Sequence, residues 1–188
     1  MESFDYEVAK NLVKTTLGTH VEAIKSKETG HPTTIISDVN GTLTHPQIGT
    51  KIIAFLCDAL DAGIPVRITT GLPDQYMPFR IVDKLHAAQP DGKWLLPKPF
   101  TPRENNLGLP WCHPGMLIDD ESSYKRLAQG TYFDPKTETA HAFFTAWETL
   151  GSNDKIAALA DWAYLHSQLE AKKNVAPVVI AQTPAPQG

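Results

Sequence analysis

The fold is decided by the stretch TTIISDVNGTLT, residues 33–44. Its apolar centre, Ile35 and Ile36, is followed within two residues by Asp38 and then by the turn sequence Val-Asn-Gly. A short apolar run that stops at residues favouring a turn is typical of a buried β-strand. We therefore expect a strand that holds the Asp38 carboxylate at its end.

Short apolar runs and helical stretches alternate on the C-terminal side of this strand. Helical spacing of apolar residues covers 51–62 and about 75–87, and the further apolar runs are 65–69, 94–96, 116–118 and 131–133. Such alternation favours parallel strands that are joined by right-handed crossovers. The sequence therefore predicts an α/β domain of three layers, a Rossmann-like parallel sheet with helices on both faces.

Both ends of the chain carry further helical patterns. Apolar residues recur at helical spacing over 6–24 and over 155–173, whereas the end of the chain is rich in proline. We expect four parts: an N-terminal helix packed on the domain, the core, a C-terminal helix and a flexible tail, at residues 1–30, 31–150, 151–174 and 175–188.

Several side chains in these helical regions are expected to be structural. Trp147 and Trp162 are expected in the core or at a subunit contact, and the terminal helices could join two copies of the chain. An apolar stripe including Ile156 and Leu159 should dock the C-terminal helix. His20, in the first helix, is predicted to lie at the surface or to be partly packed.

Composition excludes several classes of protein. The 188 residues suit one domain, and 17 Lys and Arg against 21 Asp and Glu give a net charge of −4, which does not indicate a nucleic-acid-binding protein. No apolar run is long enough to span a membrane. Two cysteines, Cys57 and Cys112, are too few for a disulfide scaffold. We expect a soluble, cytoplasmic protein.

Polar residues follow three of the predicted strands. Asp38 follows the first, Thr70-Gly71 the second, and Asp119-Asp120-Glu121 the strand 116–118. Carboxyl ends of parallel strands share one edge of a sheet, where α/β proteins bind ligands. Adjacent carboxylates repel one another unless a cation neutralises them, so the acids suggest a Mg²⁺ site. Each segment by itself could also be an ordinary turn or cap.

Taken in order, these segments resemble the haloacid dehalogenase superfamily of phosphohydrolases. The family's first motif, Asp-x-Asp-x-Thr/Val-Leu/Val, is similar to residues 38–43 except that Asn40 replaces the second acid. Thr70 resembles the second motif, and Asp119-Asp120 resembles the final acidic motif. The family's lysine is matched by Lys98 or by the nearby Lys93.

The resemblance implies phosphoryl transfer from a phosphomonoester, small or macromolecular, through an aspartyl-phosphate. Asp38 would be the nucleophile. Mg²⁺ would be held by Asp38, the backbone carbonyl of Asn40 and Asp119, with Asp120 in support. The phosphate would be bound by residues of the first turn and of the second and third motifs: Asn40, Gly41, Thr70, Gly71 and Lys98.

Asn40 departs from the phosphatase pattern. In the phosphatases of this family an Asp at this position protonates the leaving group and activates water, and an amide can do neither. Four interpretations stay open: a phosphatase that uses another group, such as His45; a phosphate-binding or regulatory protein with impaired catalysis; a member of the dehalogenase branch; or a deliberate replacement of a native Asp. The dehalogenase reaction needs no cation, so the acids at 119–121 favour phosphate chemistry.

The spacing of the motifs predicts that no large cap domain is inserted. Between Asp38 and Thr70 there is room for one turn, one helix and one strand, and between Thr70 and Asp119 for little more. A member without a cap leaves its site open to a large substrate or has it covered by a partner. The segment 97–115, which contains Arg103, Trp111 and His113, is the candidate for local specificity or a rigid connection.

Overall fold

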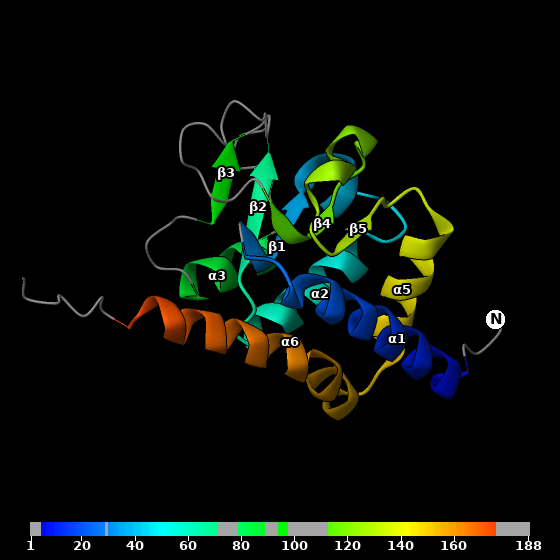
Figure 1. Cartoon of the computed structure of the whole chain (residues 1–188). Helices are drawn as coiled ribbons and strands as arrows, with labels where there is room; N and C mark the ends of the chain where they lie inside the picture. The colour runs from blue at the N-terminus through cyan, green and yellow to red at the C-terminus, as the bar shows by residue number, and fades with distance from the viewer. Residues whose placement is uncertain (1–4, 29, 71–78, 89–93, 98–112, 176–188) are drawn as a thin grey trace, which may run out of the picture.

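The computed structural model describes residues 5–28, 30–70, 79–88, 94–97 and 113–175 (Figure 1). Five strands, five α-helices and two other helical turns are assigned in these ranges. They are α1 (Tyr6–Lys25), β1 (His31–Asp38), η1 (Val39–Leu43), α2 (Gly49–Asp61), β2 (Val66–Thr70), α3 (Phe79–Ala88), β3 (Leu95–Pro97), β4 (Pro114–Ile118), η4 (Ser122–Leu127), β5 (Thr131–Phe133), α5 (Glu138–Thr149) and α6 (Ser152–Lys173).

The five strands form one parallel sheet in the order β3-β2-β1-β4-β5. β1 is central, with Ile35 opposite Val66 of β2 on one side and Met116 of β4 on the other. The sequence prediction of a parallel, Rossmann-like α/β sheet is thus confirmed.

The two faces of the sheet are covered differently. Side chains alternate between faces along a strand, and Ile35, Val66 and Met116 join the large core to which α1, α2, α3, α5 and α6 contribute. On the opposite face, Ile36 and Leu117 form a smaller cluster with Leu127 of the 3₁₀ helix η4. The α-helices of the described residues therefore lie on one face, and the short η4 packs on the other.

Chain direction explains this division. From β1 through α2 to β2, and on to α3 and β3, the chain moves one way across the sheet, whereas from β4 through η4 to β5 it moves the other way. Right-handed crossovers that run in opposite directions cover opposite faces. α1, α5 and α6 connect no neighbouring strands in this way, so handedness does not constrain them and they add to the α2 face.

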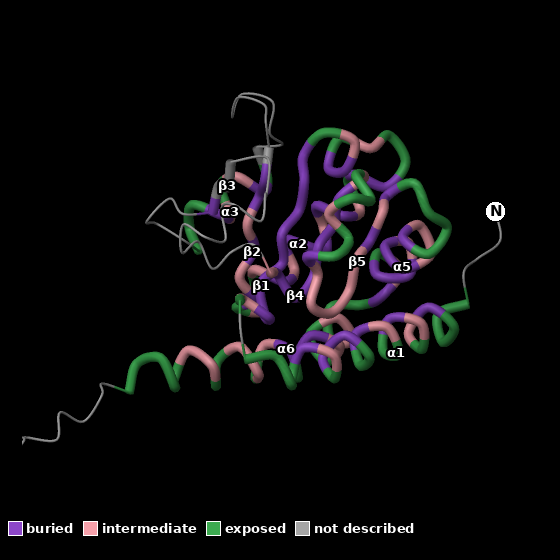
Figure 2. The backbone as a smooth tube through the Cα atoms, turned by 45° about the horizontal axis from the view of Figure 1, so that its top comes forward, coloured by how far each residue is buried: buried purple, intermediate pink, exposed green. Residues whose placement is uncertain are grey.

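The terminal helices α1 and α6 lie side by side across this face (Figures 1 and 2). α1 buries one stripe of side chains, as its periodicity predicts. α6 differs from the prediction: Ile156 is 67% exposed, and Leu159 and Trp162 are the buried residues of this helix. The reason is that α6 touches the domain along one narrow line, where the Trp162 indole Nε1 donates a hydrogen bond of 3.0 Å to the Thr33 carbonyl.

His20 is the clearest difference between sequence expectation and structure. It is fully buried, rather than at the surface or partly packed, with Nδ1 3.0 Å from the Thr131 hydroxyl and its ring centroid 4.2 Å from that of Trp162. Helical position alone could not reveal this, because the residues that cover His20 come from β5 and α6. Burial lowers the pKa of His20 to about 4.

Acid should therefore destabilise the fold partly through His20. Between pH values of about 6.5 and 4, the imidazole is protonated in the unfolded chain and neutral in the folded one, so the unfolded state binds more protons. Its contribution to the free energy of unfolding is fully present above that range and is lost as pH falls through it, by about 3 kcal/mol. Urea unfolding from about pH 7 to about pH 4 should show a weaker loss in His20→Phe than in the original chain.

The exposed His86 provides the matched control for this measurement. His86→Gln should keep the full pH dependence of the original chain. An unchanged pH dependence in His20→Phe would contradict the assignment, because acid destabilisation would then come from other groups.

Candidate metal centre

The candidate site lies where the order of the strands reverses. β1 and β4 are neighbours in the sheet although β2 and β3 come between them in the sequence. In open α/β sheets the carboxyl ends of such a pair flank a crevice, because the crossovers leave them on opposite faces. The side chains at the carboxyl ends of β1 and β4 are therefore the candidate ligand-binding groups.

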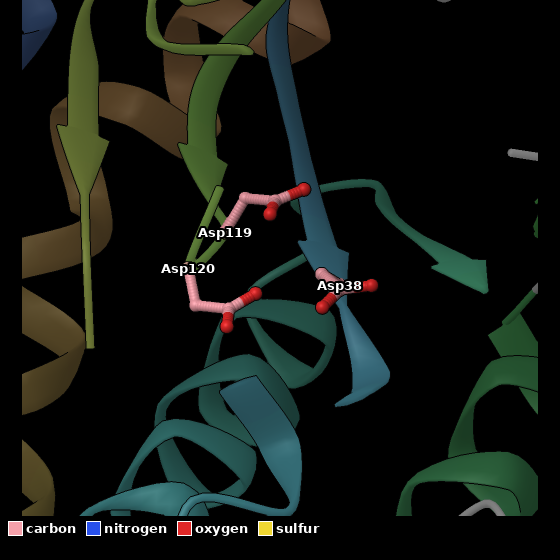
Figure 3. Close-up of side chains that lie close together, drawn as sticks. All are labelled: Asp38, Asp119 and Asp120. Atoms are coloured by element: carbon pink, nitrogen blue, oxygen red, sulfur yellow. The ribbon is translucent and has the colours of Figure 1, made fainter. Parts of the chain in front are cut away.

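Three carboxylates converge at this point: Asp38, Asp119 and Asp120 (Figure 3). Each offers an oxygen, and these oxygens all lie within 4.8 Å of one another. The register explains the approach: Ser37 is opposite Ile118, so Asp38 and Asp119 each come one residue later on adjacent strands. Asp38 and Asp119 are buried, and Asp120 is partly exposed.

The turn after Asp38 brings its backbone against Asp120. Asn40 has φ −74° and ψ 122°, and Gly41 has φ 78° and ψ −6°, which are the central angles of a type II turn. The turn is closed by hydrogen bonds from the Thr44 amide to the Val39 carbonyl at 3.1 Å and from the Gly41 amide to the Thr44 hydroxyl at 2.9 Å. A Cβ at residue 41 would lie 2.5 Å from Asp120 Oδ2, so only glycine allows this approach.

Backbone and hydroxyl groups orient the buried acids. Asp119 Oδ1 accepts a hydrogen bond of 2.9 Å from the Glu121 amide, and the Tyr132 hydroxyl donates one of 2.7 Å to the Asp119 carbonyl. The Thr42 hydroxyl lies 3.5 Å from Asp38 Oδ2. Burial, together with Asp134 and the acids of the site, raises the pKa of Tyr132, so its hydroxyl stays a donor.

Lys136 lies at the rim of the acidic cluster. Its ammonium donates a hydrogen bond of 3.2 Å to the Asp120 carbonyl and is 3.3 Å from Asp120 Oδ2. Neither Lys136 nor Tyr132 was predicted as a site residue from the sequence. A signal was available for Lys136, because it follows the last strand and the carboxyl ends of all parallel strands share one edge.

The structure describes only some of the other predicted site residues. Asn40 is exposed in the turn, and Thr70 ends β2 with its backbone opposite Pro97. The Thr70 side chain, Gly71 and both candidate lysines, Lys93 and Lys98, lie outside the described residues. The same holds for most of the segment 97–115, including Arg103 and Trp111.

His45, the suggested substitute for an acid at position 40, lies beyond the turn. Its ring meets that of His141 edge to face, with 5.5 Å between the centroids, and its Nδ1 accepts a hydrogen bond of 3.3 Å from the Gln47 amide. His141 in turn lies 2.9 Å from the Pro135 carbonyl in the connection between β5 and α5. Through His141, His45 thus connects the segment after the turn η1 to α5.

The donor set fits a divalent cation. All three groups are carboxylates, and hard oxygen ligands suit Mg²⁺, Ca²⁺ or Mn²⁺. Three carboxylates this close repel one another unless positive charge neutralises them. Lys136 supplies one such charge to Asp120, the most exposed of the three. The cluster could therefore hold a metal ion.

Comparison with known proteins finds no matching family model, no significant match among curated proteins and none among solved structures. In the part of the chain that the structure describes, no helix combines the length and the apolar character needed to cross a bilayer.

No inserted domain separates β1 from β2. All residues between these strands are described, and they hold the turn η1 and helix α2. Between β2 and β4, the described residues form α3 and β3. The fully described connection from β1 to β2 therefore contains no separate cap domain.

Proposed function

We propose that this chain is a Mg²⁺-dependent phosphohydrolase of the haloacid dehalogenase type, acting on a phosphomonoester through an aspartyl-phosphate. The observation that carries the proposal is the convergence of Asp38, Asp119 and Asp120 at the carboxyl ends of β1 and β4. The order of the sequence motifs supports it independently. We also propose that the chain has the three-layer architecture of that family.

The proposed reaction has two steps at phosphorus. An oxygen of the Asp38 carboxylate forms a bond to phosphorus, and the bond from phosphorus to the alcohol oxygen breaks, with the alcohol taking a proton from water. Water then attacks phosphorus, the Asp38 carboxylate leaves, and inorganic phosphate is released. The second step regenerates the Asp38 carboxylate.

The protein's own residues would position and neutralise the reacting groups. β1 and its hydrogen-bonded turn hold Asp38 in place before the reaction, which lowers the entropic cost of attack. Asp38, Asp119 and Asp120 would hold Mg²⁺, which supplies positive charge against the repulsion between a carboxylate and a phosphate dianion. Lys136 would contribute further positive charge at the rim. Thr70 and Lys98 stay the proposed phosphate ligands from the resemblance.

The amide of Asn40 weakens this chemistry in a defined way. General acid and base catalysis contributes about 10² to 10⁴ in rate, and the family supplies it from this position. We therefore propose slow turnover, with breakdown of the aspartyl-phosphate as the step most affected. The same observation favours, as a second candidate, a phosphate-binding or regulatory protein in which the pocket is retained and turnover is lost.

Mg²⁺ binding is the first test. A ligand at about 100 times its Kd stabilises a protein by about 2.7 kcal/mol, so saturating Mg²⁺ should raise the Tm by about 5 to 10 °C. Asp119→Asn, which keeps the side-chain size, should abolish this shift. The exposed Asp61, paired with Lys84 at 2.7 Å, offers the control Asp61→Asn, which should leave it unchanged.

A panel of phosphomonoesters, assayed with and without Mg²⁺, then separates the two candidates. Metal-dependent turnover supports the enzyme. Metal binding without turnover favours the phosphate-binding protein, and absence of both would overturn the proposal.

A further inference from the structure

A cavity of about 820 Å³ lies at the amino ends of the strands, whereas the acidic cluster lies at their carboxyl ends. Its walls come from the amino end of β1, the connection between α2 and β2, and the last turns of α6. In Figure 1 the arrows of β2 and β3 point upwards, and α6, whose last turns line the cavity, runs below the sheet. His31 lines the cavity and Asp38 ends the same strand, about 23 Å away at roughly 3.3 Å per residue.

The walls of the cavity carry an excess of positive charge. Five cationic side chains line it against two carboxylates, Glu28 and Glu170; the cations are Lys25, Lys27, Arg67, Lys172 and Lys173. Ion pairs neutralise two of the cations: Lys173 is 2.8 Å from Glu170, and Lys25 is 2.7 Å from Glu22, which lies outside the lining. Because the chain as a whole has a net charge of −4, this local excess runs against the overall charge. A concave surface lined by one sign of charge concentrates ions of the opposite sign.

Two histidines add hydrogen-bonding groups to the same walls. The Thr33 hydroxyl lies 2.9 Å from His166 Nδ1 and holds this ring in one orientation. Burial, together with Lys173 and Arg67, lowers the pKa of His31 to about 4, and burial also lowers the pKa of His166. Both rings are therefore neutral near pH 7, so they add polar groups to the wall without a further charge.

One part of the cavity wall is apolar. Leu60, Ile64, Pro65 and Leu169 line it together with Ala88. The volume of the cavity lies between about 300 and 1,000 Å³, the range of sites for small organic molecules. Its wall combines this apolar part with a larger number of charged and polar groups. Such a wall favours a ligand that has an apolar or aromatic body as well as an anionic group.

We propose that this cavity binds a small organic phosphate with an aromatic or apolar body, at a site separate from the acidic cluster. The lysines and Arg67 attract the phosphate, and the apolar wall packs against the body of the ligand. This inference does not depend on the proposed hydrolase activity. The competing explanation is that these lysines only complement the negative ends of the α1 and α6 dipoles, which predicts no binding.

Calorimetric titration of the full chain tests the proposal. AMP and phenyl phosphate are the probes, adenosine and phenol are their uncharged counterparts, and EDTA keeps divalent cations from the acidic cluster. We expect both phosphates to bind with a Kd of about 1 mM or tighter, with binding that weakens as salt rises, and the uncharged counterparts to bind at least tenfold more weakly. Failure of both phosphates to bind would overturn the proposal.

Matched variants locate the binding. Lys27→Ala with Lys172→Ala should weaken AMP binding at least tenfold, whereas Lys14→Ala with Lys125→Ala, which remove the same charge outside the cavity, should weaken it less than threefold. Asp38→Asn should bind AMP normally. Equal weakening in both double variants, or loss of binding in Asp38→Asn, would overturn the proposed site.

The NMR signals of the histidine rings report where the ligand binds, independently of its affinity. AMP should shift the ring signals of His31 and His166 and leave those of His45 and His141, near the other edge of the sheet, unchanged. The reverse pattern would place the ligand at the acidic cluster and would overturn the proposal.

Discussion

Asp38→Asn is expected to reduce metal-dependent phosphatase turnover by at least about 10⁴-fold, the scale of loss when an enzyme loses its nucleophile. Asn has the size of Asp and can still accept the contact from the Thr42 hydroxyl at 3.5 Å. The buried position should therefore keep its packing. What is lost is the negative oxygen that attacks phosphorus, and assays across the phosphomonoester panel would measure this loss.

A covalent readout separates attack by Asp38 from a role in metal binding alone. If Asn40 slows breakdown of the intermediate, the original chain should accumulate an aspartyl-phosphate, seen in intact-protein mass spectra as a gain of about 80 Da. Asp38→Asn should show no such species. Asp61→Asn, on the exposed end of α2, is the matched control and should keep both the activity and the adduct. Turnover in Asp38→Asn within about tenfold of the original chain would contradict Asp38 as nucleophile.

Asn40→Asp is expected to raise turnover by about 10² to 10⁴. The side chain at position 40 is exposed, and its backbone angles are ones that any residue adopts, so Asp fits there without strain. The new carboxyl group could protonate the leaving alcohol and later accept a proton from water. Turnover should then acquire a bell-shaped pH dependence, and the aspartyl-phosphate should no longer accumulate.

Asn40→Ala provides the control for this gain. It removes the amide without adding an acid, so turnover should not rise above the level of the original chain. If Asn40→Asp binds Mg²⁺ and still shows no gain, the missing acid is not what limits turnover. In that case the phosphate-binding protein becomes the better proposal.

The individual helices, strands and turns could be predicted from the sequence because each depends on residues that are close together in the chain. The alternation of apolar runs and helical stretches predicts the parallel sheet, and β5 coincides with its apolar run at 131–133. Parallel strands place all carboxyl ends at one edge, so Asp38 and Asp119-Asp120 could be assigned to one crevice. The turn sequence Asn-Gly likewise predicts the bend after β1, where Gly41 takes the positive φ.

Contacts between elements were less predictable, because periodicity shows which face of a helix is apolar but not what covers it. Ile156 belongs to an apolar stripe and yet faces solvent, whereas His20 is buried beneath Trp162 and β5. Lys136 reaches Asp120 from the connection after β5, sixteen residues later in the chain. Each outcome depends on where α6 and β5 lie relative to β1.

The sequence by itself determined the classes of element, the parallel sheet and the carboxylates at its carboxyl edge, since these follow from local spacing and from chain direction. Tertiary structure alone decided that β4 lies beside β1 in the register that brings three oxygens within 4.8 Å. It alone also formed the cationic cavity, whose walls come from α1, β1, α2 and α6. The physical reason is that the charge and shape of each site come from segments that are distant in the chain. Packing of the core sets the distances between these segments.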